Sequence, residues 1–217
     1  GTANTLNGES SLLFDGSMLT VNGISVGKGA NAVSTNTVVG ASALDAAVTG
    51  HHNAAFGQQT LTDNTSGQGN TAIGSSSLNN NTTGSYNVGV GYGAMAANTT
   101  AANNVAVGFV ALDVNTTGTQ NVAIGSSALG ANTTASNNTG VGYQALLANT
   151  TGASNVAVGA NALDANTTGN LNCAIGLGAL TANTTGTENV AVGAETLGLL
   201  TTGDKNVAVG KAALSSC

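Results

Sequence analysis

The feature that most constrains this chain is a 17-residue repeat that recurs without insertion or deletion. The stretch NVAVGANALDANTTGNL, residues 155–171, is followed directly by NCAIGLGALTANTTGTE, residues 172–188. The consensus is N-V-A-(V/I)-G-x-x-A-L-x-x-N-T-T-G-x-x, and we number its positions from 1 to 17. The asparagine at position 1 recurs at Asn36, Asn53, Asn70, Asn87, Asn104, Asn121, Asn138, Asn155, Asn172, Asn189 and Asn206. Such a strict period is typical of repeat architectures, in which each copy stacks on its neighbours.

Each copy has the pattern of a short strand followed by turns. Positions 2–5, for example residues 105–108 with the sequence VAVG, alternate β-branched residues with Ala and end on Gly. Alternation of this kind predicts a strand, and Gly supplies the backbone freedom that a turn needs. A helix is excluded because Gly and the Asn-Thr-Thr run interrupt the pattern every few residues.

One copy cannot fold alone, because two Val or Ile and one Leu do not offset the backbone entropy of a whole ordered repeat. Stacked copies solve this problem, since every strand then pairs with the strands above and below it. We therefore predict an all-β fold, a parallel β-solenoid or β-roll built from eleven 17-residue coils, over residues 36–217. At about 4.8 Å per coil the rod would be roughly 50 Å long.

The alternation raises the question of what covers the second face of the strand. Position 3 is Ala in most copies and Gly at Gly89 and Gly140, and position 5 is always Gly, so neither face is polar. A strand that is apolar on both faces is typically buried on both. We expect Val and Ile to face the coil interior and the small residues to face another subunit, around the axis of a homotrimer. The predicted subunit interface consists of Ala106, Ala123, Ala157, Ala174 and Ala191.

Residues 1–35 lie outside the period, and we expect them to form a β-meander that caps the first coil or joins it to another part. Asp15-Gly16 and Asn22-Gly23 are strong hairpin signals between short apolar runs. The other end stops within the eleventh copy. Two interpretations are open there: a truncated coil, or protomers that join end to end into a fibril through unpaired strand edges.

Composition and charge exclude several functions. The net charge is −6 with three Lys and no Arg, which argues against a nucleic-acid partner. No apolar run is long enough for membrane insertion, and no signal peptide is visible. Two Cys do not make a disulfide framework or a metal site. Since no catalytic constellation or phosphate-binding loop is present either, we expect no enzyme activity, no metal and no cofactor.

Three sets of residues are candidate sites. The position 1 asparagines are expected to form a structural ladder of amides along the rod. The Asn-Thr-Thr and Asn-Thr-Ser runs are either turn residues or glycosylation sequons. Their asparagines are Asn64, Asn81, Asn98, Asn115, Asn132, Asn149, Asn166 and Asn183. Tyr92, Phe109 and Tyr143 share position 6 and are expected to point outward, where they either contact a sugar ligand or pack on the next coil or subunit.

The repeats also resemble known families. NVAVG and NVAIG resemble the S-V-A-I-G repeat of YadA-like trimeric adhesin heads. The phrase NTTGxxNVAVGxxAL, with the lead-in of residues 12–44, is more similar to bacteriophage tail-fibre proteins. The 17-residue period and the lack of a coiled-coil stalk and membrane anchor depart from the adhesin pattern. The resemblance implies a left-handed β-roll, trimeric assembly and a role in surface attachment.

From these observations we expect a non-enzymatic structural protein, a fibre segment of a phage-type tail fibre or another extracellular appendage. It would act as a rigid spacer at the virion or cell surface. The alternatives are an adhesin head that binds a host glycan or matrix receptor through its lateral surface, and a self-assembling extracellular fibril, with or without glycosylation. The expected partners are copies of the chain itself and a cell-surface glycan or receptor.

Overall fold

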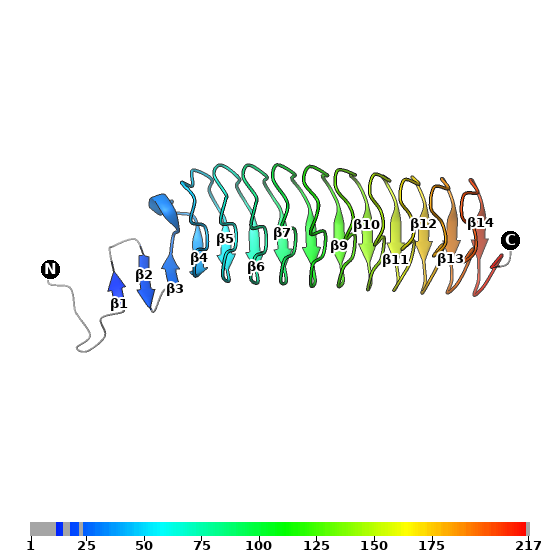
Figure 1. Ribbon diagram of the computed structural model, residues 1–217, viewed down its shortest axis with the longest axis horizontal. Coiled ribbons are helices and arrows are strands. Elements are labelled where there is room, and N and C mark those ends of the chain that lie inside the picture. The colour runs from blue at the N-terminus through cyan, green and yellow to red at the C-terminus, as the bar shows by residue number, and fades with distance from the viewer. Residues whose placement is uncertain (1–11, 15–17, 22–23, 216–217) are drawn as a thin grey trace.

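The computed structural model describes residues 12–14, 18–21 and 24–215, which form one continuous 14-stranded sheet with the strands in chain order. The sheet runs along a rod in which each coil is offset by one strand from the last (Figure 1). A short 3-10 helix, η1, spans Ala30–Ala32. The strands are β1 Leu12–Phe14, β2 Met18–Val21, β3 Ile24–Gly27, β4 Thr37–Gly40, β5 Ala54–Phe56, β6 Thr71–Ile73, β7 Val88–Val90, β8 Val105–Val107, β9 Val122–Ile124, β10 Thr139–Val141, β11 Val156–Val158, β12 Cys173–Ile175, β13 Val190–Val192 and β14 Val207–Val209.

The first three strands are antiparallel and extend the sheet at one end of the rod (Figure 1). β3 continues the same pattern by pairing antiparallel with β4, so that Val26 lies opposite Val39. The expected turns at Asp15-Gly16 and Asn22-Gly23 lie outside the described residues. The strands on either side of them have the order of a meander.

From β4 onward every pairing is parallel and the register equals one repeat. Val105 pairs with Val122 and Ala106 with Ala123, a shift of one full copy, and the same shift recurs up to β14. Parallel pairing places equivalent side chains in columns along the rod. The predicted parallel β-solenoid of 17-residue coils is confirmed. We number the coils from Asn36, so that coil 5 is residues 104–120, coil 6 is 121–137 and coil 7 is 138–154.

The inside and outside of the strand are the reverse of the prediction. The position 3 alanines are fully buried within a single chain, whereas Val and Ile at positions 2 and 4 face outward and are half-buried or exposed. The predicted subunit interface is therefore wrong, because no neighbouring subunit can reach these side chains. They are Ala106, Ala123, Ala157, Ala174 and Ala191, each 0% exposed.

The reason is the width of the coil. The interior opposite the strand is filled by the segment at positions 8 and 9, where Leu78, Leu112 and Leu129 are 0% exposed. In the coils that have Gly at position 3, a Cβ on Gly89 would lie 2.5 Å from Ser77 Oγ and 3.4 Å from Leu78 Cγ. In these coils space for one methyl group or less remains, so the larger β-branched side chains face outward. Coil 1 is the exception, since its position 3 residue, Val38, is buried at 1% exposed.

The backbone adopts the left-handed conformation at three non-glycine positions in most coils. In coil 6 these are Ser127, Leu129 and Asn137, at positions 7, 9 and 17, with φ of 56°, 53° and 64°. A left-handed residue costs about 1–2 kcal/mol for an L-amino acid. Leu129 offsets this cost by full burial and by a hydrogen bond from its N–H to Ala145 O at 2.9 Å in the next coil.

Position 5 tolerates only Gly. Gly125 has a φ of 136°, a region that side chains rarely allow, and a Cβ there would collide with the carbonyl of Gly142 in the next coil. The chain reverses direction at this point in every coil, so the strict Gly at position 5 follows from the coil geometry.

Candidate functional site

The position 1 asparagines form the predicted ladder, which is confirmed. Asn121 Nδ2 donates to Ala135 O at 2.8 Å across its own coil. Its Oδ1 accepts the backbone N–H of Asn138 at 3.0 Å, one coil further along the rod. The side chain is 0% exposed. Each amide therefore closes its own coil and holds the next one, which is a structural role.

A second asparagine ladder occupies position 12. Asn149 Nδ2 donates to Asn132 Oδ1 at 3.0 Å in the preceding coil and to Gly152 O at 2.9 Å in its own. Glycosylation at these sequons is therefore wrong for the folded rod, because the amide nitrogen that would carry the sugar is buried and already hydrogen-bonded. The residues concerned are Asn64, Asn81, Asn98, Asn115, Asn132, Asn149, Asn166 and Asn183, each 0% exposed.

This second ladder ends at a buried acceptor without a partner. Position 12 of the next coil is Leu200, which cannot donate a hydrogen bond, and Asn183 Oδ1 is left unsatisfied. A buried polar atom without a partner costs about 1–3 kcal/mol. The sequence could have indicated this point, since Leu200 interrupts the column of asparagines.

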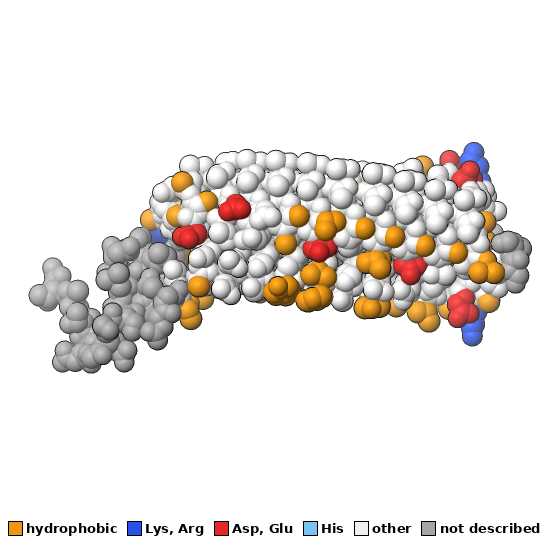
Figure 2. Space-filling model, viewed as in Figure 1, with side chains coloured by type: hydrophobic (Ala, Val, Ile, Leu, Met, Phe, Trp, Pro, Cys, Tyr) orange, Lys and Arg blue, Asp and Glu red, His pale blue; other side chains and the backbone are white. Residues whose placement is uncertain are grey.

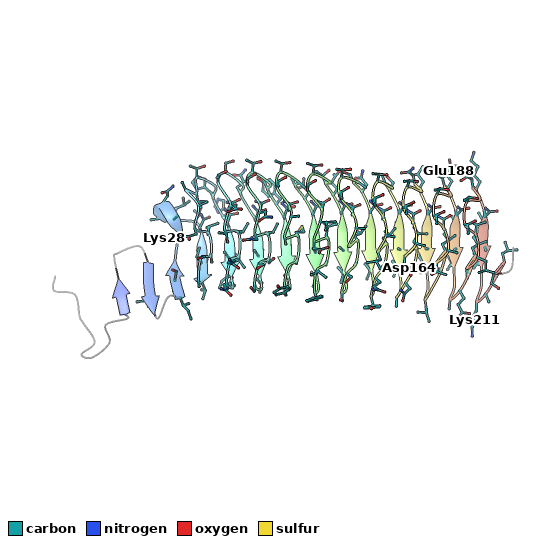
Figure 3. The ribbon with its side chains drawn as sticks, viewed as in Figure 1. Lys28, Asp164, Glu188 and Lys211 are labelled. Atoms are coloured by element: carbon teal, nitrogen blue, oxygen red, sulfur yellow. The ribbon has the colours of Figure 1, made fainter. Side chains whose placement is uncertain are left out.

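The outer face of the sheet is an apolar strip along the rod. Position 4 is apolar in all eleven coils, and its members expose substantial area, for example Ile73 at 42% and Ile124 at 40%. Hydrophobic side chains spread along the visible side of the rod, whereas Lys is confined to its two ends (Figure 2). Lys28 lies at the β3 end and Lys211 at the β14 end (Figure 3). We call positions 2 and 4 of β4–β14 the outer strand face.

The aromatic residues at position 6 point outward, as expected. Tyr92, Phe109 and Tyr143 are 58%, 57% and 54% exposed. Tyr92 and Phe109, in adjacent coils, stack with ring centroids 5.6 Å apart and an interplanar angle of 14°. Tyr92 and Phe109 thus pack on each other across adjacent coils, which is one of the two expected roles. Their outer surfaces stay available to a ligand.

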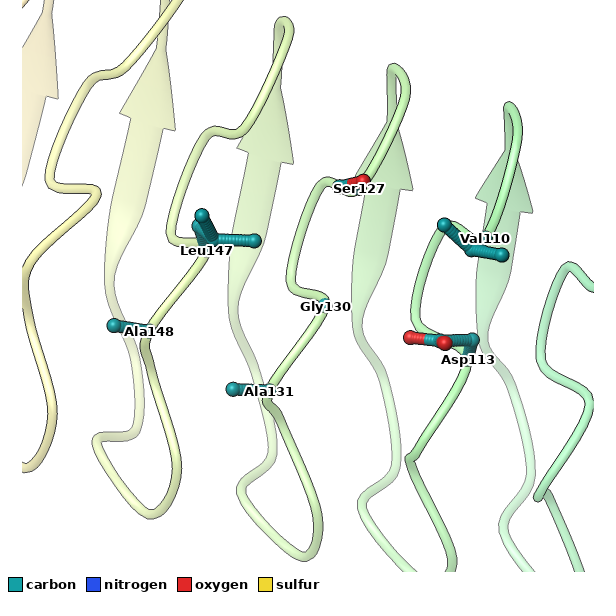
Figure 4. A pocket seen from close by; sticks show the side chains of 7 residues that line it. All are labelled: Val110, Asp113, Ser127, Gly130, Ala131, Leu147 and Ala148. Carbon is teal, nitrogen blue, oxygen red and sulfur yellow. The ribbon is translucent and has the colours of Figure 1, made fainter.

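A hollow of about 360 Å³ lies on the turn segment of coils 5–7 (Figure 4). Gly130 lies in its lining, and a Cβ there would come 3.2 Å from Leu147 Cδ1 of the next coil. The pKa of the Asp113 carboxyl is raised by burial, an effect that backbone hydrogen bonds partly oppose. The lining residues are Val110, Asp113, Ser127, Gly130, Ala131, Leu147 and Ala148.

Two further carboxylates, Asp164 and Asp204, make local polar contacts. Asp164 accepts hydrogen bonds from the Thr181 hydroxyl at 2.7 Å and from Asn161 Nδ2 at 3.1 Å. Asp204 accepts the backbone N–H and the hydroxyl of Thr187, at 2.6 and 3.0 Å, and these bonds lower its pKa. In the part of the chain that the structure describes, no three potential metal ligands cluster and no helix is long and apolar enough to cross a membrane.

No protein-family model matches the chain, and neither a curated protein nor a solved structure matches it. The conclusions about function therefore depend on the geometry of the rod and its lateral surface.

Proposed function

We propose that this chain is a non-enzymatic structural segment of an extracellular fibre, of the phage tail-fibre or appendage type, that serves as a rigid spacer for surface attachment. The observation that supports this proposal most strongly is the continuity of the axial hydrogen bonds. Coils 5 and 6 are joined by paired strands, by Asn121 N–H to Asn104 Oδ1 at 2.9 Å, and by Thr116 Oγ1 to Thr133 O at 3.2 Å. A rod in which three columns of bonds run in parallel resists bending and local opening.

The outer strand face is the surface through which copies of the chain associate, as a homotrimer. A strip of eleven strands is roughly 50 Å long and roughly 10 Å wide, about 500 Å². Monomeric proteins rarely expose apolar patches larger than a few hundred Å². Threefold packing around this face replaces the alanine interface expected from the sequence, and the number of subunits follows from the resemblance to trimeric fibres.

Native mass spectrometry tests the assembly. The intact chain is expected as a trimer, and Ile124→Lys on the outer strand face is expected to lower the trimer fraction. Thr117→Lys is the matched control, because Thr117 is exposed on a different side of the coil. A monomeric wild-type chain, or equal assembly of both variants, contradicts the proposed interface.

The external location of the chain is tested on intact virions or producing cells. An antibody against residues 36–217 is expected to label a projecting fibre on intact virions or producing cells, seen by immuno-electron microscopy. Labelling only after lysis contradicts an external spacer.

An adhesive role is the second candidate, and the exposed aromatic column at position 6 favours it. Exposed aromatic rings offer large, rigid contact surfaces of the kind that binding sites use. In this case the same rod is the ligand-binding head, and host glycan is the partner.

A further inference from the structure

Coil 6 differs from coil 5 at four surface positions and from coil 7 at three of them, since coil 7 also has Ala at position 11. Positions 6, 7, 10 and 11 of this coil are all small, whereas the flanking coils carry large side chains at most of these positions. Because parallel register places equal positions side by side, the small residues form the floor of a transverse groove. We call it the coil-6 groove, and its floor residues are Ser126, Ser127, Gly130 and Ala131.

The walls of the groove begin with two aromatic rings. Phe109 and Tyr143 occupy position 6 in coils 5 and 7, and Ser126 stands between them. Backbone bonds fix this order: Ser127 N–H donates to Phe109 O at 3.0 Å, and Gln144 N–H donates to Ser126 O at 3.0 Å. Two coils span roughly 9.6 Å, and Tyr92 and Phe109 in adjacent coils stack with ring centroids 5.6 Å apart, so one ring position between Phe109 and Tyr143 is empty. The interval therefore has room for one ring.

Further along the groove two polar side chains, Asp113 and Ser127, join an otherwise apolar lining. The hollow of about 360 Å³ opens beside Ser127, with Asp113 on the coil-5 side and Leu147 on the coil-7 side (Figure 4). A hollow of this size falls within the range of small-ligand sites. It offers a carboxylate that accepts hydrogen bonds and a hydroxyl that both donates and accepts.

We propose that the coil-6 groove binds a neutral pyranose sugar. One sugar ring inserts over Ser126 between Phe109 and Tyr143, with its C–H faces against the aromatic rings. Its hydroxyl groups, or those of the next sugar in the chain, reach Ser127 and Asp113. A pyranose fits because its two faces are apolar and its edge is polar, which is the division that the groove presents.

The charge of the groove selects among sugars. Asp113 is the ionisable group in the lining of the hollow, and the whole chain carries a net charge of −6. Sugars that bear carboxylate or sulfate groups are repelled, since a like charge brought to a partly buried carboxylate is unfavourable. Neutral hexoses and N-acetylhexosamines are the expected ligands.

This inference deepens the adhesive candidate and does not depend on the spacer role or on the trimer. Loss of glycan binding would leave the predicted trimer and the external fibre untouched. Conversely, a monomeric chain that binds sugar through coil 6 would support the groove and contradict the assembly.

The test compares two matched variants of the intact chain on an array of neutral and acidic oligosaccharides. Ser126→Tyr fills the space between Phe109 and Tyr143 with an aromatic ring. Ser75→Tyr places the same ring at position 6 of coil 3, beside Tyr92 and away from the groove. Both serines are half-buried, so equal melting temperatures are expected for the two variants.

We expect wild type and Ser75→Tyr to retain the same neutral glycans, and Ser126→Tyr to bind them at least roughly tenfold more weakly. Phe109→Ala and Tyr143→Ala should weaken binding in the same way. Leu177→Ala, an exposed position 6 residue in coil 9, should leave it unchanged. Absence of any neutral glycan on the wild-type chain, preference for acidic glycans, or equal binding by the two tyrosine variants overturns the proposal.

Discussion

Replacing Asn121 by Ala tests the role of the asparagine ladder. The substitution removes two hydrogen bonds, from Asn121 Nδ2 to Ala135 O at 2.8 Å and from the Asn138 N–H to Asn121 Oδ1 at 3.0 Å. Both backbone partners stay in a buried environment, since Ala135 is 6% exposed and Asn138 0%. The Asn138 N–H is left without an acceptor, whereas Ala135 O keeps a hydrogen bond from Asn132 Nδ2 at 3.0 Å. A buried group without a partner costs about 1–3 kcal/mol, so we expect Asn121→Ala to lower the free energy of unfolding by about 1–3 kcal/mol per chain.

The matched control is Asn80→Ala. Asn80 is exposed, and its side-chain oxygen accepts a bond from the neighbouring Asn79 at 3.1 Å. Exposed substitutions of this kind change stability by about 0.5 kcal/mol or less. The comparison holds the chemical change constant and varies only burial and ladder membership.

The assay combines chemical denaturation with hydrogen exchange. Denaturation gives the total loss, and exchange locates it, because the amide of Asn138 is the donor that Asn121 leaves without an acceptor. We expect faster exchange concentrated in coils 6 and 7. If Asn121→Ala is no less stable than Asn80→Ala, or if the loss is spread evenly over the rod, the ladder does not hold adjacent coils together.

Three further predictions follow from individual residues. Gly125→Ala forces a side chain against the next coil at a φ of 136° and should destabilise the rod by several kcal/mol, whereas Gly178→Ala, with no atom within 4 Å of the new Cβ, should cost only about 1–2 kcal/mol. Similar melting curves for the two variants would contradict the coil geometry. Leu200→Asn gives Asn183 Oδ1 a donor and should therefore be about 1–3 kcal/mol more stable than Leu200→Ala in denaturant titration. A less stable asparagine variant would show that the position 12 ladder does not extend to residue 200. Burial raises the pKa of Asp113, so the stability that this carboxyl contributes is present at low pH and is lost as pH rises through the folded pKa, whereas the Thr187 hydrogen bonds lower the pKa of Asp204, whose contribution is lost as pH falls. Carboxyl titration by NMR should find the pKa of Asp113 above its ordinary value and the pKa of Asp204 below it. The reverse order would refute both assignments.

The fold could be predicted because the repeat carries its own register. Because the repeat has no insertions, stacked coils pair with a constant shift of 17 residues. This stacking gives the side chains of both Asn121 and Asn138 hydrogen-bond partners in the adjacent coil. The position 12 asparagines were ambiguous, because Asn-Thr-Thr is both a turn sequence and a sequon. Only the structure shows that their amides point into the coil and bond to one another.

The faces of the strand could not be assigned from alternation alone. The pattern V-A-V separates the two sides but does not say which side is interior. That depends on the coil width, which is set by Leu129 and its equivalents on the opposite segment. The left-handed conformation of these leucines was also hidden, since tertiary burial overrides the local preference that a sequence pattern reports.

The coil-6 groove was hidden for a related reason. Ser126 and Gly130 are ordinary residues within their own repeat, and they form a depression only because larger residues occupy the same positions one coil away on either side. Reading the repeat in columns as well as along the chain would have found it.

The most direct test of the account is the distance between spin labels along one column. Pairs of Cys at Thr83 and Thr117, Thr151 or Thr185, in chains with Cys173→Val and Cys217→Ser, place labels on exposed position 14 side chains two, four and six coils apart. In assemblies diluted with unlabelled chain, electron–electron resonance should give distances that increase linearly by roughly 4.8 Å per coil, reaching roughly 29 Å for the longest pair. Distances that do not scale with the number of intervening coils would contradict the stacked rod.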